Sequence, residues 1–257
     1  MKVSNNNDIL YLVSKETDNS FVRQMVEKCL VLVDEPLTSP YFEITSKGNE
    51  LFFHTRLDNK PILVGGFSLP VLWNKLVRQR GAVKKEPLAK AIGLKNIKEN
   101  KMVVDMSCGT GKDSLLLLSF GANVHAFERD RIIYIILYFY FLQLKTLDNF
   151  PKERFILSEG SPHDFNFDNV PAVIYFDPMY SENANKKAAP RKHMAIFRDF
   201  VGLDHDYLEH LKYALNVASN RVVLKRPLKS EVIFPDLISH SIKGKSTRYD
   251  VYLTKPD

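Results

Sequence analysis

The chain has 257 residues, of which 45% are hydrophobic and 26% charged, so it can form one large domain or two small ones around an ordinary core. Its first residues lack the apolar stretch and cleavage site of a signal peptide, and two cysteines, Cys29 and Cys108, give neither a disulfide framework nor a metal-ligand pattern. We therefore expect a cytoplasmic protein with no membrane anchor and no metal.

The formal net charge of +6 is concentrated in one stretch. Between Leu72 and Lys101 lie nine lysines and arginines and only two glutamates. Such a stripe is expected in a protein that meets phosphate backbones, and a solvated helix face explains it equally well.

The first part of the chain mixes short strand-like runs with one helix, separated by turn signals. The predicted strands are Ile9–Val13, Tyr41–Ile44, Leu51–Thr55 and Ile62–Val64, and the predicted helix is Ser20–Leu32. This pattern indicates a small α+β domain over residues 1–80. Two helices are predicted within the basic stretch, between Leu72 and Lys98.

From Lys101 onward, strands and helices alternate, which predicts a mostly parallel sheet over residues 81–257. The predicted strands are Met102–Met106, Asn123–Phe127, Phe155–Leu157, Ala172–Phe176 and Arg221–Lys225, with helices at Lys112–Phe120, Ile132–Lys145 and Asp204–Ala218. The last two strands, Leu237–Ile242 and Tyr249–Thr254, read as an antiparallel hairpin. The apolar run Ile132–Leu142 is too short to span a membrane, which takes roughly 20 residues, and is predicted to be a buried helix.

The first predicted strand of the sheet ends in a candidate nucleotide-binding loop. Gly109 and Gly111 permit a tight turn and close approach of a ligand, and the helix that starts over Thr110–Asp113 favours a carboxylate at its N-terminus. Asp105 at the strand tip can accept hydrogen bonds from an ammonium group. Glu128 ends the next strand, about 20 residues on, where an acid binds ribose hydroxyls.

Other residues refine the choice of cofactor. The third glycine of the dinucleotide pattern would fall on Ser114, which disfavours NAD. Gly160 and Ser161 follow the third strand and are placed to border an adenine. Together with the C-terminal hairpin, these features favour the class I fold of methyltransferases that use S-adenosylmethionine (SAM), an α/β Rossmann-like fold, here preceded by the small α+β domain.

A second loop, Asp177-Pro178-Met179-Tyr180, follows another apolar strand. An exocyclic amine of guanine or adenine is a poor nucleophile, and the Asp177 carboxylate and the Pro178 carbonyl can accept its protons in hydrogen bonds. Tyr180 can stack on the base. We predict these three as catalytic residues for methyl transfer to a nucleobase nitrogen. Basic residues near this edge are predicted RNA contacts: Lys186, Lys187, Arg191, Lys192, Lys225 and Arg226.

With these motifs in hand, the chain resembles the ribosomal RNA small subunit methyltransferase J (RsmJ) family. The likeness lies in residues 105–113, 128–129, 177–180 and 223–227, and further in 90–95 and 243–252. The resemblance implies SAM-dependent methylation of a guanine N2 in 16S ribosomal RNA, with that RNA or the small ribosomal subunit as partner. Carried over by position, it implies cofactor contacts at Lys112, Asp113, Glu128, Arg129, Gly160, Ser161 and Asp177.

Three alternatives remain open from the sequence. One is an adenine-N6 methyltransferase acting on DNA or RNA. Another is an RNA-binding or ribosome-assembly module that has lost catalysis. The third is NAD-dependent chemistry.

Overall fold

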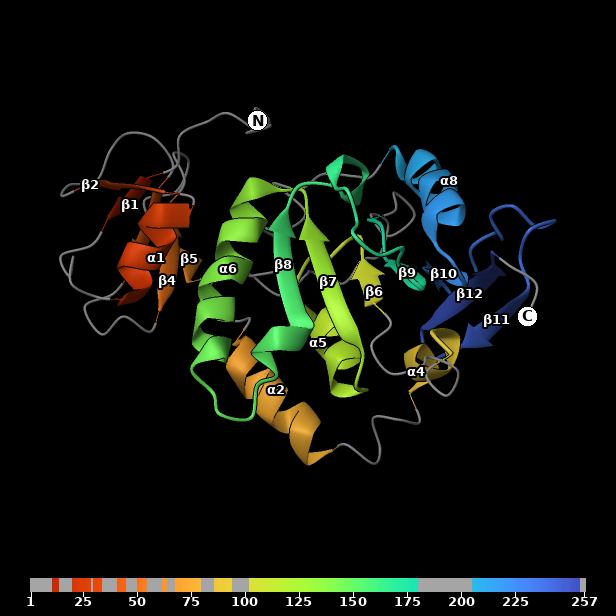
Figure 1. Cartoon of the computed structure of the whole chain (residues 1–257), viewed down its shortest axis with the longest axis horizontal. Helices are drawn as coiled ribbons and strands as arrows, with labels where there is room; N and C mark the ends of the chain where they lie inside the picture. The colour runs from red at the N-terminus through yellow and green to blue at the C-terminus, as the bar shows by residue number, and fades with distance from the viewer. Residues whose placement is uncertain are drawn as a thin grey trace.

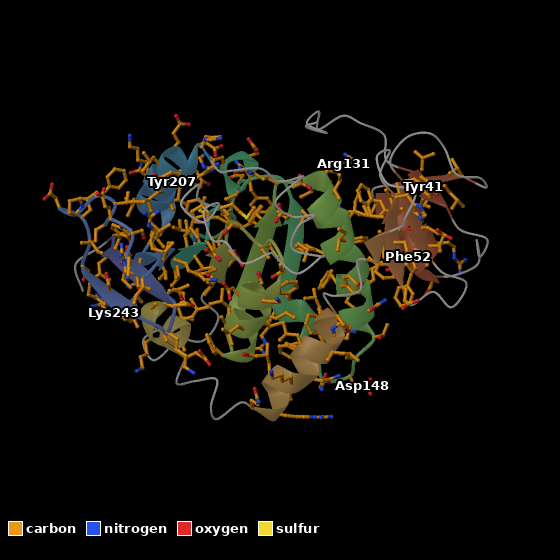
Figure 2. The ribbon with its side chains drawn as sticks, turned by 180° about the vertical axis from the view of Figure 1, so that it is seen from behind. Tyr41, Phe52, Arg131, Asp148, Tyr207 and Lys243 are labelled. Carbon is orange, nitrogen blue, oxygen red and sulfur yellow. The ribbon has the colours of Figure 1, made fainter. Side chains whose placement is uncertain are left out.

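In the computed structural model, the described residues are 11–13, 20–28, 30–33, 41–44, 50–54, 62–63, 68–79, 86–93, 102–179 and 205–254. These residues form two sheets, of five and seven strands, with helix α6 (Arg131–Lys145) lying between them (Figure 1). Tyr41 and Phe52 of the first sheet lie at one end of the molecule, and Tyr207 and Lys243 lie at the other (Figure 2).

The larger sheet has the strand order β11-β12-β10-β9-β6-β7-β8. Its strands are β6 (Met102–Asp105), β7 (Asn123–Glu128), β8 (Phe155–Glu159), β9 (Val173–Phe176), β10 (Arg221–Pro227), β11 (His240–Lys243) and β12 (Thr247–Leu253). The first five are parallel, and β12 and β11 form the antiparallel hairpin that the sequence predicts. The chain runs outward from β6 through β7 to β8 and then returns to β9 on the other side. The strand order therefore reverses between β6 and β9, where open α/β sheets bind ligands.

Both faces of the central strands of this sheet are buried, because alternate residues enter two different apolar clusters. Val103 and Tyr175 belong to one cluster, and Val104 and Ile174 belong to the other. The first cluster includes α2 (Leu69–Arg78), α4 (Pro87–Ala91), α5 (Lys112–Ser119) and α6, and the second includes α8 (Tyr207–Val217). Because β6, β7, β8, β9 and β10 run in the same direction between these layers, their carboxyl ends lie at one edge of the sheet.

Helix α6 is apolar on all sides because it packs against two partners. Its Phe141 ring contacts Phe155 of β8 at 5.2 Å between centroids. On the other side, its Phe139 meets Phe21 of α1 (Ser20–Lys28) edge-on at 6.3 Å. The predicted buried helix is therefore confirmed. Among the helices that the structure describes, none combines the length and the apolar character needed to cross a membrane.

The smaller sheet has the order β2-β1-β3-β4-β5, formed by β1 (Tyr11–Val13), β2 (Val31–Val33), β3 (Tyr41–Ile44), β4 (Leu51–His54) and β5 (Ile62–Leu63). Strand β2 corrects one prediction, because the helix expected over Ser20–Leu32 ends at Lys28. The short run Val31–Val33 instead pairs in parallel with β1, as its two β-branched valines favour.

Helix α2 begins at Leu69, three residues before the predicted start, because Pro70 is tolerated in the first helical turn. It packs against α5 and α6. Its Trp73 ring also meets Phe150, in the turn after α6, at 5.3 Å, and the Trp73 Nε1 donates to Asn149. The domain boundary at residue 80 stays a prediction. Helix α2 precedes this boundary in the sequence, but it packs against helices that follow the boundary.

Candidate active site and cofactor pocket

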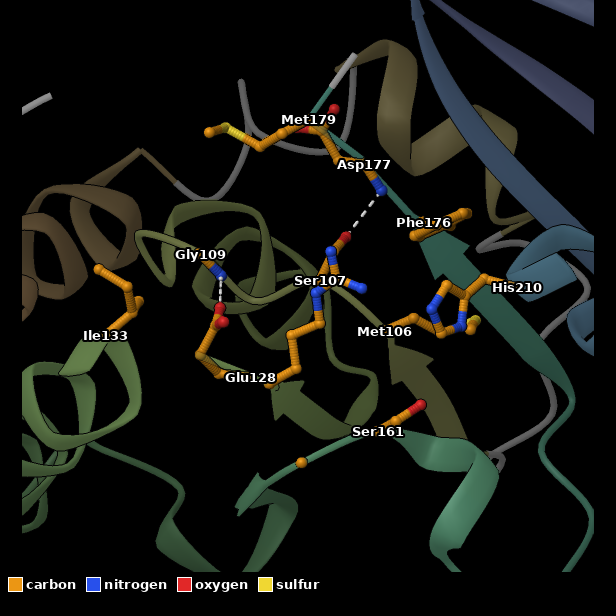
Figure 3. A pocket seen from close by; sticks show the side chains of 12 residues that line it. Met106, Ser107, Gly109, Glu128, Ile133, Ser161, Phe176, Asp177, Met179 and His210 are labelled. Carbon is orange, nitrogen blue, oxygen red and sulfur yellow. Dashed lines mark hydrogen bonds between the residues drawn. The ribbon is translucent and has the colours of Figure 1, made fainter. Parts of the chain in front are cut away.

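A pocket lies where the strand order reverses, at the carboxyl ends of β6, β7, β8 and β9 (Figure 3). Its open space is about 640 Å³, part of which is continuous with the surrounding solvent. Six residues predicted from the sequence line it: Gly109, Glu128, Arg129, Gly160, Ser161 and Asp177. The glycine loop and the Asp177 loop therefore face one cavity.

The two glycines of the first loop have different roles. Both have positive φ, +54° at Gly109 and +73° at Gly111, which favours glycine. Gly109 lines the pocket. A Cβ on Gly111 would lie 3.1 Å from Leu137 and 3.3 Å from Leu69, so its lack of a side chain serves the packing of the loop against α6 and α2. Gly111 was predicted as a cofactor contact and lies outside the pocket lining.

Glu128 fastens the glycine loop to the end of β7. Its side chain is buried, and its two oxygens accept hydrogen bonds from the backbone N–H of Gly109 at 2.8 Å and of Asp130 at 2.9 Å. An ionised carboxylate has about four acceptor positions, so these bonds use only part of its capacity. Glu128 can thus hold the loop and still present acceptor positions to a ribose.

Asp105 is turned into the protein instead. It is 1% exposed and does not line the pocket. Its oxygens accept hydrogen bonds from the Ser107 N–H at 3.1 Å and from the Ser114 hydroxyl at 2.5 Å. Its carboxyl group therefore braces the turn between β6 and α5, and a contact with the cofactor ammonium, directly or through water, stays a prediction. Burial raises its pKa to about 7.

We predict that Asp105→Asn gains stability relative to wild type as the pH rises from 4 to 8. An acid whose pKa is raised by folding binds protons more tightly in the native state. Its contribution to stability is therefore greatest below its unfolded pKa, and it falls until the pH passes about 7. Asparagine removes this loss, on the order of a few kcal/mol. The test is to measure the unfolding midpoints of both proteins across this pH range. The exposed Asp168→Asn is the control variant. If the midpoints of Asp105→Asn and wild type changed in parallel with pH, the prediction would be contradicted.

A network of charges joins the start of α5 to the start of the Asp177 loop. The ammonium of Lys225 contacts Asp113 Oδ2 at 2.7 Å and Asp177 Oδ2 at 2.8 Å. The Tyr175 hydroxyl donates to the same Asp113 oxygen at 2.6 Å. Burial, and next the Asp113 carboxylate, raises the pKa of Tyr175, so this hydroxyl remains a donor at neutral pH. Asp113 and Lys112 were predicted to contact the cofactor, but neither lines the pocket, and the Lys112 side chain is exposed.

The backbone of the Asp177 loop is also tied to the glycine loop. The Asp177 N–H donates to the Ser107 hydroxyl at 2.8 Å (Figure 3). Pro178 is buried directly after it. Tyr180, the third predicted catalytic residue, lies outside the described residues. The two loops are thus held in contact by a backbone bond as well as by Lys225.

The opposite wall of the pocket includes a histidine that sequence patterns do not reveal. Arg129 donates two 3.0 Å bonds to the Asp206 carboxylate, which also contacts His210 Nε2 at 3.1 Å. His210 lines the pocket and shares a 2.7 Å hydrogen bond with His163. Burial, and next His210, lowers the pKa of His163. Five further unpredicted residues line the pocket: Met106, Ser107, Ile133, Phe176 and Met179.

The family comparison agrees with this arrangement. A profile of the family described as putative SAM-dependent methyltransferases matches residues 55–254. The chain belongs to this family. The predicted class I methyltransferase fold and SAM dependence are confirmed with it.

Individual relatives of this SAM-dependent methyltransferase carry more specific names. It is 39% identical over 187 residues to ribosomal RNA small subunit methyltransferase J of Thioalkalivibrio sulfidiphilus, covering 68% of this chain and 70% of the relative. It is 37% identical over 182 residues to the protein of the same name from Alteromonas mediterranea, covering 68% and 69%. These matches confirm the resemblance to the RsmJ family. A SAM-dependent methyltransferase of Neisseria gonorrhoeae shares the fold, with a TM-score of 0.67, 23% identity and coverage of 96% and 97%.

The pocket of this methyltransferase fits SAM. The Glu128 carboxylate suits ribose hydroxyls, and the amide groups at the start of α5 lie next to the glycine loop. Apolar walls from Met106, Ile133 and Phe176 suit an adenine ring. No group of three or more histidine, cysteine, aspartate or glutamate side chains suited to a metal ion occurs in the part of the chain that the structure describes.

The predicted RNA contacts divide into two sets. Lys186, Lys187, Arg191 and Lys192 lie outside the described residues. Arg226 is only 3% exposed and donates to the Glu231 carbonyl, so its placement does not support phosphate contact. Lys225 is held between two carboxylates, so its placement does not support a phosphate contact either. The sequence alone does not show that Lys225 and Arg226 point into the protein and not to the surface. The direction of both side chains depends on the strands that pair with β10.

Proposed function

We propose that the protein transfers the methyl group of SAM to the exocyclic N2 of a guanine in small-subunit ribosomal RNA. The observation that carries this proposal is the shared pocket of Glu128, Gly109 and Asp177. The RNA substrate is suggested by relatives named ribosomal RNA small subunit methyltransferase J. An enzyme with this substrate would work in the cytoplasm, on 16S ribosomal RNA or on the small subunit.

In this proposal, the chain's residues orient the base and prepare its nitrogen. SAM supplies an electrophilic methyl group on a sulfonium. The amine nitrogen of a base has its lone pair delocalised into the ring, and acceptors for its N–H groups free that pair for attack. The Asp177 carboxylate and the Pro178 carbonyl are the proposed acceptors, with Asp177 able to take up the released proton. Because Asp177 is fixed through Ser107 and Lys225, most of the rate would come from positioning.

Base stacking and RNA binding complete the proposal. We assign stacking on the target base to Tyr180. Lys186, Lys187, Arg191 and Lys192, which follow in the same segment, are the proposed phosphate contacts, and they would give salt-dependent affinity without selecting the base.

The test is methyl transfer from labelled SAM to small subunits and to naked 16S ribosomal RNA, each taken from cells lacking this enzyme. Digestion to nucleosides should give N2-methylguanosine. Recovery of N6-methyladenosine would instead show an adenine methyltransferase. RNA binding without any transfer would indicate a module that has lost catalysis. A thermal shift with NAD but none with SAM would contradict the cofactor assignment.

A further inference from the structure

Lys225 and Asp177 occupy equivalent positions on neighbouring strands. In the parallel pairing of β10 with β9, Leu224 is opposite Phe176. The residues that follow are Lys225, still in β10, and Asp177, directly after the end of β9. Their side chains meet at 2.8 Å at the edge of the sheet. The same ammonium reaches Asp113 at the start of α5, at 2.7 Å. One lysine thus joins the end of β9 to the start of the cofactor helix.

This ion triad is partly shielded from water. The side chains of Lys225, Asp113 and Asp177 are 21%, 26% and 37% exposed, so their attraction is screened less than that of a surface pair. Burial alone would lower the pKa of Lys225, but the Asp177 and Asp113 carboxylates outweigh that effect and raise it. Lys225 therefore carries its charge throughout the physiological range. The Tyr175 hydroxyl further anchors Asp113.

Without that charge, two carboxylates would face each other across a narrow gap. Asp113 and Asp177 both direct Oδ2 at the lysine nitrogen. Like charges this close are unfavourable unless one side chain rotates away or takes a proton. Asp177 is the more exposed of the two and lies on a loop, whereas Asp113 is in a helix, so Asp177 is the one expected to move.

We propose that Lys225 is a positioning residue for methyl transfer, which holds the Asp177 carboxylate at the angle needed to accept the N–H of the target base. This role rests on the proposed function of Asp177 and replaces the RNA-phosphate contact expected from the sequence. In this arrangement, Asp177 Oδ2 accepts from Lys225, and Asp177 Oδ1 is the atom that accepts from the reacting amine.

The first test compares Lys225→Met, Lys225→Arg and the exposed control Lys229→Met. Lys225→Met should lower kcat by about 10²-fold, the cost of misplacing a reacting group by about 1 Å. Its KM for RNA and Kd for SAM should change little, and Lys225→Arg should recover most of the loss. Lys229→Met should keep the wild-type kcat. A raised KM for RNA with unchanged kcat would overturn the proposal in favour of a phosphate contact.

The double variant Lys225→Met/Asp113→Asn separates positioning from simple charge balance. If Lys225 served only to prevent repulsion between Asp113 and Asp177, removing both charges would restore kcat together with the unfolding temperature, and the proposal that Lys225 itself holds Asp177 would be overturned. If Lys225 holds Asp177, the unfolding temperature should recover while kcat stays low.

Wild-type turnover distinguishes this inference from the proposed function. An active wild type with an equally active Lys225→Met variant would overturn the inference alone. An inactive wild type would overturn the proposed methyl transfer. The contact between Lys225 and Asp177 would then be tested by the unfolding midpoints of Lys225→Met, Asp177→Asn and the variant that carries both changes. Non-additive shifts would support Lys225 as the group that places Asp177, and additive shifts would overturn it.

Discussion

Asp177→Asn is expected to lower kcat by about 10²–10⁴-fold, the range that a positioned proton acceptor contributes. Asparagine keeps the shape of the side chain but loses the charge that accepts from the base and pairs with Lys225. The Ser107 bond to the backbone N–H of residue 177 does not depend on the side chain, so the loop should keep its path.

Single-turnover kinetics with saturating SAM measure this effect, and titration calorimetry measures the Kd for SAM, which should shift far less than kcat. The exposed Asp168→Asn, on the connection between β8 and β9, controls for the loss of one negative charge and should keep full activity. An Asp177→Asn variant with wild-type kcat would remove Asp177 from the reaction.

Glu128→Gln is expected to weaken SAM binding by about 10- to 100-fold, corresponding to roughly 1–3 kcal/mol for a buried polar group left unpaired. Glu128 accepts one backbone N–H on each oxygen, from Gly109 and from Asp130. Glutamine has a single acceptor oxygen, so one of these N–H groups would face an amide NH2. The glycine loop would then shift, and an acceptor for the ribose would be lost.

Glu159→Gln is a matched control for this variant. Glu159 ends the adjacent strand β8, directly opposite Glu128 in the parallel register. Its side chain is 36% exposed, pairs with Arg131 at 3.6 Å and does not line the pocket. Calorimetric titration with SAM and with its demethylated product should show the loss for Glu128→Gln alone. Equal affinities of the two variants would contradict the ribose assignment.

Sequence patterns predicted most strands of the larger sheet because they are short apolar runs between turn residues. Strand β11 (His240–Lys243) is mostly polar and exposed, and it begins three residues after the predicted start at Leu237. Strand β9 and helix α5 both lie within one residue of their predicted bounds. Strand β2 was missed because three apolar residues are too few to show whether their period is that of a helix or a strand. Its pairing with β1 decides its conformation, and this is a tertiary contact.

The direction of a side chain was harder to predict than its place in the chain. Asp105 and Glu128 both end a parallel strand, yet only Glu128 lines the pocket, because Ser107 and Ser114 bind Asp105 from inside the turn. His210 and Ile133 come from helices whose approach to the pocket depends on the whole fold. Ser107 is different, because it lies within the glycine-loop motif of the sequence. A hydroxyl at that place could have been predicted to bind the neighbouring loop, as it does through the Asp177 N–H.

The packing of α6 has a consequence for how this enzyme can be divided. Phe139 is fully buried, with Phe21 of α1 as one of its neighbours, and Trp73 of α2 covers Phe150 nearby. A fragment that starts at residue 81 would keep every strand of the catalytic sheet but leave this aromatic surface bare to solvent. Such a fragment should self-associate through the exposed aromatic face of α6. The N-terminal segment is therefore needed to cover this face and keep the catalytic part monomeric.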